Sequence, residues 1–425
     1  MSERRMKILF IVPGSGDPFY CGNCFRDNQQ ANALRRRGHD VVVMPLYLPL
    51  RDPSFRADTP LFFPAVSLYL SQKYFPGRPP ARWVESLLNS DFALRLAASF
   101  SGSTSARGME ELTLAMITGE DEVFRRQVHA LVEWIGEHER PDIVHLSSSL
   151  IIGIGKEIKK ATRQPVVCSL QDEELWIDGM EKAWAEAARK GIEENMHYVD
   201  AFITSSKFYQ GIARSRFPGL QRLQVVYPGV DIARYAWPHY PEHPTLGFFY
   251  RMNQANGLHI LAEAFARIQR EKRLPQLRLR IGGGFTSADK PFLRKTARIL
   301  SPYQDRVDWL QGYNPAEHAA FYKGISAICV PITFEESVGL YLCEAFAAGR
   351  PAIEPRSGSF AEIVGDAGLL YEPNTSRALA DAIESLFTTP NLWEQCREQA
   401  LHYAATRYNH ATLAEQLQAI YADLL

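Results

Sequence analysis

The sequence predicts an α/β protein built from two doubly wound halves that face each other across a central cleft. The first observation is a β–loop–α–β unit at the start, where the apolar run Lys7–Val12 precedes a loop with Gly14 and Gly16, a helical stretch and a second apolar run. The second is that this alternation restarts after a Pro-rich stretch at residues 237–244. Ligands of open parallel sheets bind beyond the carboxyl ends of the strands, so two such halves predict one shared cleft.

The first half is expected to span residues 1–236. Its opening strand is followed by a helix from Asp27 to about Arg37, which Gly38 ends, and by the strand DVVVMPL. Residues 50–135 mix aromatic, Pro and basic residues, and we interpret them as a mostly helical elaboration. Strands are then expected at PDIVHLSS, QPVVCSLQD and VDAFITSS, and the stretch Gln224–Asp231 closes this half.

The second half is expected to span residues 237–405. Strands are predicted at TLGFFYRM, LRLRIGGG, SAICVPI and RPAIEP, and helices at Gly257–Ile268, GLYLCEAFAAG and SRALADAIESLF. We expect residues 406–425 to form a C-terminal helix that packs back on the first half.

Length and composition are those of a multidomain globular protein. A chain of 425 residues predicts two or three domains at about 100–200 residues each. With 47 Lys and Arg against 48 Asp and Glu, the net charge of −1 argues against a nucleic-acid binder held by long-range charge. No apolar run approaches the roughly 20 residues of a membrane span, and six Cys do not form a disulfide framework. We therefore expect a cytoplasmic protein.

Two glutamates near the end of the second half form the most informative pattern. Glu336 and Glu344 are separated by seven residues, and the helix Leu340–Ala348 begins between them. At 1.5 Å per residue, about 12 Å separates them along the axis, which suits two polyols joined by a diphosphate. A capping Glu and a structural buried Glu are the alternative. The free amides expected to face the anion are those of Val338, Gly339 and Leu340.

The residues from Glu336 to Pro351 resemble the E-x7-E signature of retaining family-four glycosyltransferases (group 1), which have the GT-B fold. RRRGHDVVVM, VVYPGVDIARY and SGSFAEIVGDAGLLYEPNTSRALADAI resemble further stretches of that family in the same order. Residues 50–135 are the main exception. The resemblance implies transfer of a hexose-type sugar from a nucleotide-diphosphate donor to an acceptor hydroxyl, with no metal or other cofactor.

The resemblance also implies roles for single residues of the second half. Glu336 should hold hydroxyls of the donor sugar, and Glu344 should hold the ribose. GFFYRMNQANGLHIL lines up with an R-x4-K-G diphosphate site, which places Arg251 at the Arg position and Gly257 at the Gly position. Asn256 stands at the Lys position, so one full positive charge is missing there.

Other implied site residues lie at strand ends and in loops. Gln171 stands where the family often has a His that reaches the donor sugar, and Asp172 is the nearest carboxylate. Gly22 lies in the loop that approaches the diphosphate or the acceptor, where the absence of a Cβ allows close contact. Gly283 belongs to the loop near the base, and Tyr313 is a candidate for stacking on that base.

Two other classes of enzyme have weaker support. Cys21-Gly-Asn-Cys24 is a C-x-x-C between a strand and a helix, which suits a thiol-redox protein, but no compact thioredoxin pattern surrounds it. Gly14-Ser-Gly16 lacks the third Gly of a dinucleotide fingerprint. A nucleotide- or glycan-binding protein with weakened catalysis remains a further alternative, motivated by Asn256 and Gln171.

Two features concern the rest of the first half. His145 ends a strand, where a single His is more often structural than catalytic. In the segment Phe62–Leu88, aromatic residues are interleaved with Lys73, Arg78 and Arg82. This pattern suits either the acceptor side of the cleft with membrane contact that is at most peripheral, or ordinary packing of a helical insertion.

Overall fold

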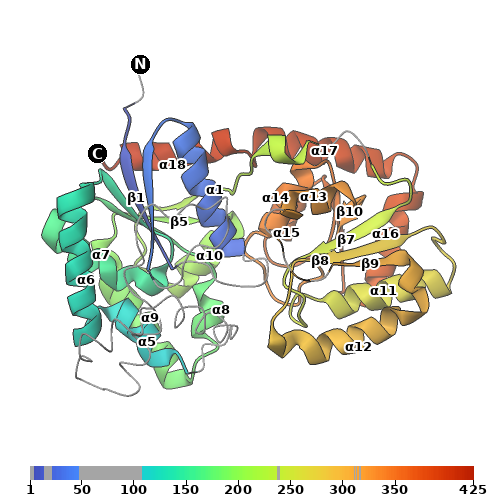
Figure 1. Ribbon diagram of the computed structural model, residues 1–425, viewed down its shortest axis with the longest axis horizontal. Helices are drawn as coiled ribbons and strands as arrows, with labels where there is room; N and C mark the ends of the chain where they lie inside the picture. Colours follow the sequence, from blue (N-terminus) through green and yellow to red (C-terminus); the bar gives the residue numbers. More distant parts are fainter. Residues whose placement is uncertain are drawn as a thin grey trace.

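The protein has two α/β domains that lie side by side, each built on a parallel sheet (Figure 1). The computed structural model describes residues 4–13, 22–46, 108–236, 240–310, 312, 314 and 317–425. In the described part, the N-terminal sheet has the order β2-β1-β3-β4-β5-β6 and the C-terminal sheet the order β12-β11-β10-β7-β8-β9. The fold class predicted from the sequence is confirmed.

The N-terminal domain alternates strands with helices along the chain. Its strands are β1 (Lys7–Val12), β2 (Asp40–Pro45), β3 (Ile143–Leu146), β4 (Val166–Ser169), β5 (Ala201–Thr204) and β6 (Leu223–Val225). Its α-helices are α1 (Gly22–Arg36), α5 (Glu110–Thr118), α6 (Glu122–Trp134), α7 (Ile152–Thr162), α8 (Glu173–Ile177), α9 (Lys182–Asn195) and α10 (Lys207–Arg216).

The C-terminal domain repeats this alternation. Its strands are β7 (Thr245–Phe249), β8 (Arg278–Gly282), β9 (Val307–Trp309), β10 (Ala327–Ile328), β11 (Ala352–Pro355) and β12 (Gly368–Tyr371). Its α-helices are α11 (Leu258–Arg270), α12 (Lys290–Leu300), α13 (His318–Lys323), α14 (Leu340–Ala347), α15 (Phe360–Val364), α16 (Ser376–Thr388) and α17 (Leu392–Thr406). The last helix of the chain is α18 (His410–Ala422).

The strand orders place one switch point in each sheet, and these points position the cleft. In the N-terminal sheet β1 lies between β2 and β3, and in the C-terminal sheet β7 lies between β10 and β8. Successive connections leave these strands in opposite directions across the sheet, which opens a crevice at their carboxyl ends. The loops after β1, β3, β4, β7 and β10 lie at these edges and supply residues of the site.

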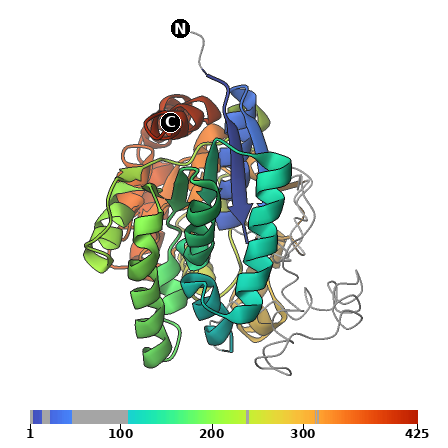
Figure 2. The ribbon, with the colours of Figure 1, turned by 90° about the vertical axis from the view of Figure 1, so that its left-hand side faces the viewer.

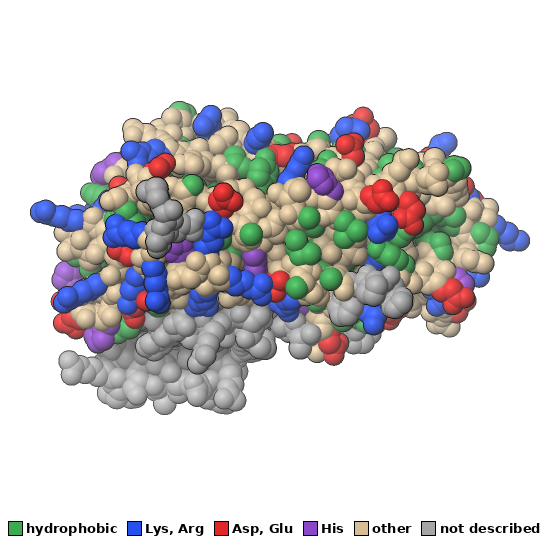
Figure 3. Space-filling model, turned by 90° about the horizontal axis from the view of Figure 1, so that it is seen from above, with side chains coloured by type: hydrophobic (Ala, Val, Ile, Leu, Met, Phe, Trp, Pro, Cys, Tyr) green, Lys and Arg blue, Asp and Glu red, His purple; other side chains and the backbone are tan. Residues whose placement is uncertain are grey.

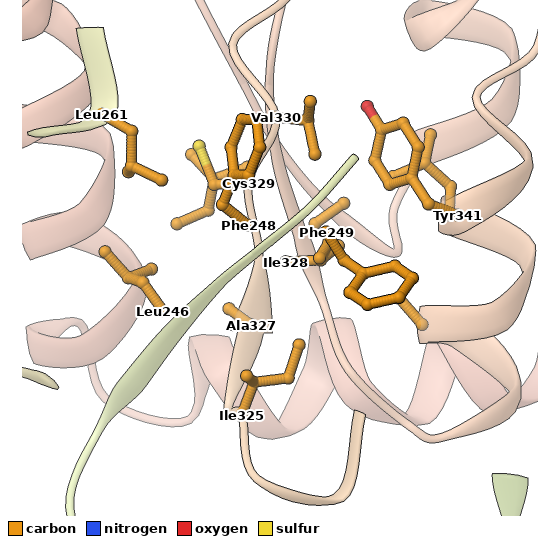
Figure 4. Close-up of a cluster of buried hydrophobic side chains, with 14 of the residues drawn as sticks. Leu246, Phe248, Phe249, Leu261, Ile325, Ala327, Ile328, Cys329, Val330 and Tyr341 are labelled. Atoms are coloured by element: carbon orange, nitrogen blue, oxygen red, sulfur yellow. The ribbon is translucent and has the colours of Figure 1, made fainter. Parts of the chain in front are cut away.

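The cores follow the alternation of buried side chains along the strands. In β1, Leu9 and Ile11 belong to the cluster under α6 and α7, whereas Ile8 and Phe10 belong to the cluster under α1. In the C-terminal domain, side chains of β7, β10 and α11 meet in one cluster (Figure 4). Both sheets are thus covered on both faces, as parallel sheets require.

Helix α18 lies on the N-terminal domain, although the chain reaches it from the C-terminal domain. The red helices α17 and α18 run along one side of both domains in Figure 1, and α18 lies beside the blue elements in Figure 2. Leu417 and Tyr421 pack with Phe10 in the cluster under α1. The hydroxyl of Tyr421 lies 2.7 Å from Nδ1 of the fully buried His145 in β3. Residues 406–425 therefore tie the end of the chain to the first domain.

A second surface hollow lies where the end of α1 meets α18. It is lined by polar and charged side chains, among them Arg35, Arg36, Arg234 and Asp231. Figure 3 shows the face that contains α17 and α18, where Lys and Arg side chains gather mainly over the N-terminal domain. Within the described residues, no helix has the length and apolar character needed to cross a bilayer.

Helix α1 begins earlier than predicted. The expected start was Asp27, but the helix begins at Gly22. Sequence reasoning missed the first turn because α1 buries polar residues, from Arg26 to Gln30, in place of an apolar stripe. Of the predicted elaboration at residues 50–135, the described part contains α5 and α6, and the segment Phe62–Leu88 lies outside the described residues.

Leu417→Ala is expected to lower the free energy of unfolding by about 2–5 kcal/mol, because it opens a cavity under α18 in a core that is fully buried. The measurement is urea denaturation of the full chain. Leu425→Ala is the matched control, because Leu425 is 47% exposed and its loss should change little. Equal stabilities of the two variants would contradict the packing of α18 on this domain.

Candidate functional site

A cleft of about 450 Å³ lies between the two domains at the predicted edges of the sheets. The N-terminal domain lines it with the start of α1 and the loops after β1, β3 and β4, and the C-terminal domain with the loops after β7 and β10. The predicted residues found on its lining are Gly22, Gln171, Asp172, Arg251, Asn256, Glu336, Val338 and Leu340.

Glu336 reaches the cleft from the loop between β10 and α14. Its side chain is 5% exposed, and Oε1 accepts hydrogen bonds from the amides of Val338 at 3.4 Å and Gly339 at 3.2 Å. The expectation that these two amides are free for an anion is therefore wrong, because the Glu336 carboxylate already occupies the start of the helix. Burial raises the pKa of Glu336, and the bonds from these amides oppose that rise.

Asp172 faces Glu336 from the loop after β4 and connects the two domains. Its backbone is left-handed, with φ 60°, and Oδ2 accepts a hydrogen bond of 2.5 Å from the Ser337 hydroxyl. The carbonyl of Ser337 accepts another of 2.5 Å from Ser206, at the start of α10. Burial and the nearby Glu336 carboxylate raise the pKa of Asp172 well above its usual range.

Gln171 joins the same loop to α1. Its side-chain Nε2 donates to Oδ1 of Asp27 over 2.8 Å, and its carbonyl accepts from the side chain of Asn23 at 3.3 Å. Its own amide donates to Glu173 over 2.6 Å. These bonds orient Gln171 on the cleft wall and hold the start of α1 against the strand end.

The loop after β7 supplies Arg251 and Asn256. The Arg251 guanidinium is largely buried and pairs with Asp289, with 3.1 Å between Nη2 and Oδ2, and it also donates to Thr286 over 3.2 Å. The Asn256 side chain donates to the carbonyl of Arg251 over 2.8 Å. The charge of Arg251 is thus balanced within the protein, and Asn256 shapes the loop that carries it.

Two of the predicted glycines allow this loop to pack closely. At Gly257, φ is 74° and an added Cβ would lie 1.8 Å from the carbonyl oxygen of Pro331. At Gly283, φ is 107° and an added Cβ would lie 2.3 Å from the carbonyl oxygen of Tyr250. Both glycines therefore support the loop from behind, and neither is on the described lining of the cleft. Tyr313 lies outside the described residues.

Glu344 is enclosed in the C-terminal domain. It has no exposed surface, and its two carboxylate oxygens accept hydrogen bonds from Tyr235 at 2.6 Å and Tyr322 at 2.8 Å. Nε2 of His318 lies 2.8 Å from Oε1. The prediction that this buried carboxylate needs partners agrees with the structure, which places it away from the described lining of the cleft.

The structure also locates His145 and part of the C-x-x-C motif, which the sequence analysis considered as catalytic groups. His145 is fully buried, its Nε2 lies 2.8 Å from the Ser169 hydroxyl, and burial lowers its pKa to about 3. It is therefore a neutral structural residue, in line with the prediction. Cys24 lies on the lining of the cleft, whereas Cys21 lies outside the described residues. Nowhere in the described ranges do three His, Cys, Asp or Glu side chains form a group that could hold a metal.

Sequence reasoning missed Arg26 and Asp27, which line the cleft from α1. Both are nearly buried, with exposed fractions of 4% and 3%. Burial raises the pKa of Asp27 to about 7, while the neighbouring Arg26 opposes the rise. The polar run from Arg26 to Gln30, next to a Gly-containing loop, was the signal available in the sequence.

Comparisons with known proteins agree with this geometry. The model of the family described as Glycosyl transferases group 1 matches residues 243–389, and that of Glycosyltransferase Family 4 matches residues 118–234. The matches cover both domains. The chain belongs to the family 4, or group 1, glycosyltransferases.

Similar curated proteins come from several bacteria. The D-inositol 3-phosphate glycosyltransferase of Corynebacterium glutamicum (strain R) is 29% identical over 221 residues, 48% of this chain and 52% of the relative. The protein with the same name from Pseudarthrobacter chlorophenolicus is 26% identical over 292 residues, 62% of this chain and 68% of the relative. The matched region thus spans about half the length of the Corynebacterium protein.

Solved structures show the same fold over the full chain. HepE of Anabaena in complex with UDP has a TM-score of 0.68 and 19% identity, covering 99% of this chain and 100% of that one. Sucrose-phosphate synthase of Thermosynechococcus elongatus has a TM-score of 0.69 and 17% identity, covering 98% and 99%. The chain therefore has the GT-B fold.

Glu344→Ala is expected to lower the free energy of unfolding by about 2–5 kcal/mol, because it removes the carboxylate that accepts hydrogen bonds from two buried tyrosine hydroxyls. Denaturant unfolding of the full chain measures this. Glu263→Ala, at an exposed position of α11, serves as the control. A Glu344 variant of unchanged stability that loses nucleotide affinity would instead favour contact with the ribose.

Asp27→Asn is expected to change the pH dependence of stability. The pKa of Asp27 is about 7 in the folded protein against a usual 3.8, so between these values the folded state binds more protons than the unfolded state. The contribution of Asp27 to stability should therefore fall as pH rises from 5 to 8, so the stability of the variant relative to wild type should increase over this range.

Urea unfolding at pH 5 and pH 8 measures the difference. Asp178→Asn is the control, because Arg216 lowers the pKa of Asp178, which is then ionised in both states throughout this range. Its effect on stability should be the same at both pH values. Parallel pH profiles of wild type and Asp27→Asn would contradict the assignment.

Proposed function

We propose that the protein is a retaining glycosyltransferase that moves a hexose-type sugar from a nucleotide-diphosphate donor to an acceptor hydroxyl. The observation that carries the proposal is the placement of Glu336 in the interdomain cleft, held by the amides at the start of α14. A carboxylate fixed in this way offers an oriented acceptor for hydroxyl groups of a sugar. The donor is proposed to lie against the C-terminal wall, with its sugar at Glu336.

The kinds of ligand found with similar proteins support a nucleotide sugar. HepE of Anabaena, which shares the fold, has been solved with UDP and with UDP-glucose. The curated relatives named above carry the name of a glycosyltransferase that acts on an inositol phosphate. Applied to this chain, these names favour a nucleoside-diphosphate donor and an acceptor with free hydroxyls.

The residues of the cleft suit charge stabilisation at the leaving diphosphate. The acceptor hydroxyl would attack the anomeric carbon on the face from which the diphosphate leaves. Arginine side chains and the first-turn amides of α1 would stabilise the negative charge that develops on the leaving group. The proposal assigns this task to the protein and not to a metal ion, so transfer is expected to persist in EDTA. Asp172 and Gln171, on the opposite wall, would face the sugar.

A second candidate is a nucleotide-binding protein of the same fold with weakened catalysis. It is favoured by the neutral Asn256 and by the pairing of Arg251 with Asp289, which together leave little net positive charge on the C-terminal wall. Such a protein would bind a nucleoside diphosphate without transferring a sugar.

Glu336→Gln is expected to reduce transfer by about 100-fold or more, because the amide cannot accept sugar hydroxyls as a carboxylate does. Nucleoside-diphosphate affinity should stay within about threefold of wild type. The assay is release of UDP, GDP or ADP from a panel of nucleotide sugars, with and without EDTA. The matched control is Glu335→Gln, an exposed neighbour that should behave as wild type.

The two candidates give different results in this assay. Binding of a nucleoside diphosphate without turnover of any sugar in the panel would favour the binding protein. Full activity of Glu336→Gln with a donor that wild type uses would reject the role of Glu336. Failure to bind any of the nucleotides would reject both candidates.

A further inference from the structure

Arg26 occupies an unusual position for a positive charge. It lies one turn after Gly22 in α1 and lines the cleft, yet its side chain is only 4% exposed. Nε and Nη2 are buried and have no hydrogen-bond partner among the described residues. Buried guanidinium groups are normally paired, because arginine cannot lose its charge and desolvation is costly. An unpaired one on the wall of a cleft indicates a missing anion.

The carboxyl groups near Arg26 do not replace that anion. Asp27 bonds to Gln171, and Asp172 bonds to Ser337. Burial raises the pKa of Asp27 to about 7, so Asp27 is only partly ionised at neutral pH, and burial also raises the pKa of Asp172 well above its usual range. The third carboxylate of this wall, Glu173, accepts hydrogen bonds from Ser148, Ser149 and Gln171, so Arg26 is the basic group of the N-terminal wall that none of these bonds involves.

On the C-terminal wall of the cleft, by contrast, the positive charge is already paired within the protein. Arg251 and Arg26 are the basic side chains among the described residues that line the cleft, and Asp289 pairs with Arg251. Asn256 beside it is neutral and bonds to the backbone. A diphosphate bound between the walls would thus meet its uncompensated cation on α1.

Arg26 lies in the first turns of α1, at the end of the helix that adjoins the opposite domain. Side chains of a helix point back toward its N-terminus, and residues four apart lie on one face, so Arg26 leans over Gly22. A Cβ added at Gly22 would lie 3.7 Å from the hydroxyl of Tyr250, next to Arg251. The start of α1 therefore adjoins the loop that carries Arg251, and its first-turn amides favour anions at the same place.

We infer that Arg26 binds the diphosphate of the donor from the N-terminal domain and supplies the charge that the C-terminal wall lacks. This inference rests on the proposed function. The donor would then contact both domains, and its diphosphate would link α1 to the loop after β7. An anionic group on the acceptor has the same chemistry, and the experiment separates these two sources.

The test compares binding of UDP, GDP and ADP, and of the matching nucleosides, by calorimetry. Arg26→Gln should weaken binding of the preferred nucleoside diphosphate about 10- to 100-fold and leave the nucleoside unchanged. The affinity of Arg26→Gln for the diphosphate should also depend less on the salt concentration, because one contact between opposite charges is lost. Arg26→Lys should keep part of the affinity, and Arg37→Gln, at an exposed position just after α1, should bind as wild type.

Two further measurements separate ligand binding from a structural role. Without ligand, Arg26→Gln should unfold at or above the wild-type temperature, because an unpaired buried charge has been removed. The double variant Arg26→Gln/Asn256→Lys should regain diphosphate affinity, because it places a cation on the facing wall.

Several results would overturn the inference. One is an unchanged diphosphate affinity in Arg26→Gln. If this variant instead showed only a raised KM for the acceptor in a transfer assay, the anion that Arg26 binds would belong to the acceptor. Loss of nucleoside binding or a lower unfolding temperature without ligand would assign Arg26 a structural role. If the double variant bound the diphosphate no better than Arg26→Gln, a cation at residue 256 could not replace Arg26, and the inference would be rejected. Absence of diphosphate binding in wild type would instead reject the proposed function itself.

Discussion

The direction of the two parallel sheets is the constraint on which the site depends. All strands of a parallel sheet end at the same edge, so the polar residues after β1, β3 and β4 gather on one side of the N-terminal domain. The loops after β7 and β10 gather in the same way on the C-terminal domain. Because these two edges face each other, residues more than 300 positions apart in the chain, such as Gly22 and Glu336, line one cleft.

Direct contacts hold these edges together. The Ser337 hydroxyl donates to Asp172, and Ser206 donates to the carbonyl of Ser337, so the loop that carries Glu336 is tied to two elements of the other domain. Glu362 in α15 adds a third connection, because its carboxylate accepts from the amides of Lys207 and Phe208 at the start of α10. Helix α18 completes the link by packing beside α1. The position of Glu336 relative to Asp172 is therefore set by contacts between domains, not by its own loop alone.

Charge is distributed unevenly between the walls of the cleft. Arg251, the residue that the family pattern assigns to the diphosphate, is paired with Asp289, and the position of the family Lys holds a neutral Asn256. Arg26 on the facing wall has a buried guanidinium with unpaired nitrogens. Glu344, which the pattern assigns to the ribose, is enclosed by Tyr235, Tyr322 and His318. At several residues, the role that the family pattern assigns thus disagrees with the contacts seen in the structure. These contacts show which polar groups are already paired within the protein and which can still bind a ligand.

The sequence by itself determined the two α/β domains, most strand positions and the placement of Glu336 before a helix, because these depend on local apolar periodicity and on Gly and Pro at element ends. Only the tertiary structure decided that Val338 and Gly339 donate to Glu336, that Glu344 is sealed from the cleft, and that α1 starts at Gly22. It also decided that Arg26 is buried without partners. The physical reason is that burial and hydrogen-bond pairing depend on elements distant in sequence, so a polar residue in a helix has the same local pattern whether it faces water, a core or the opposite wall of a cleft.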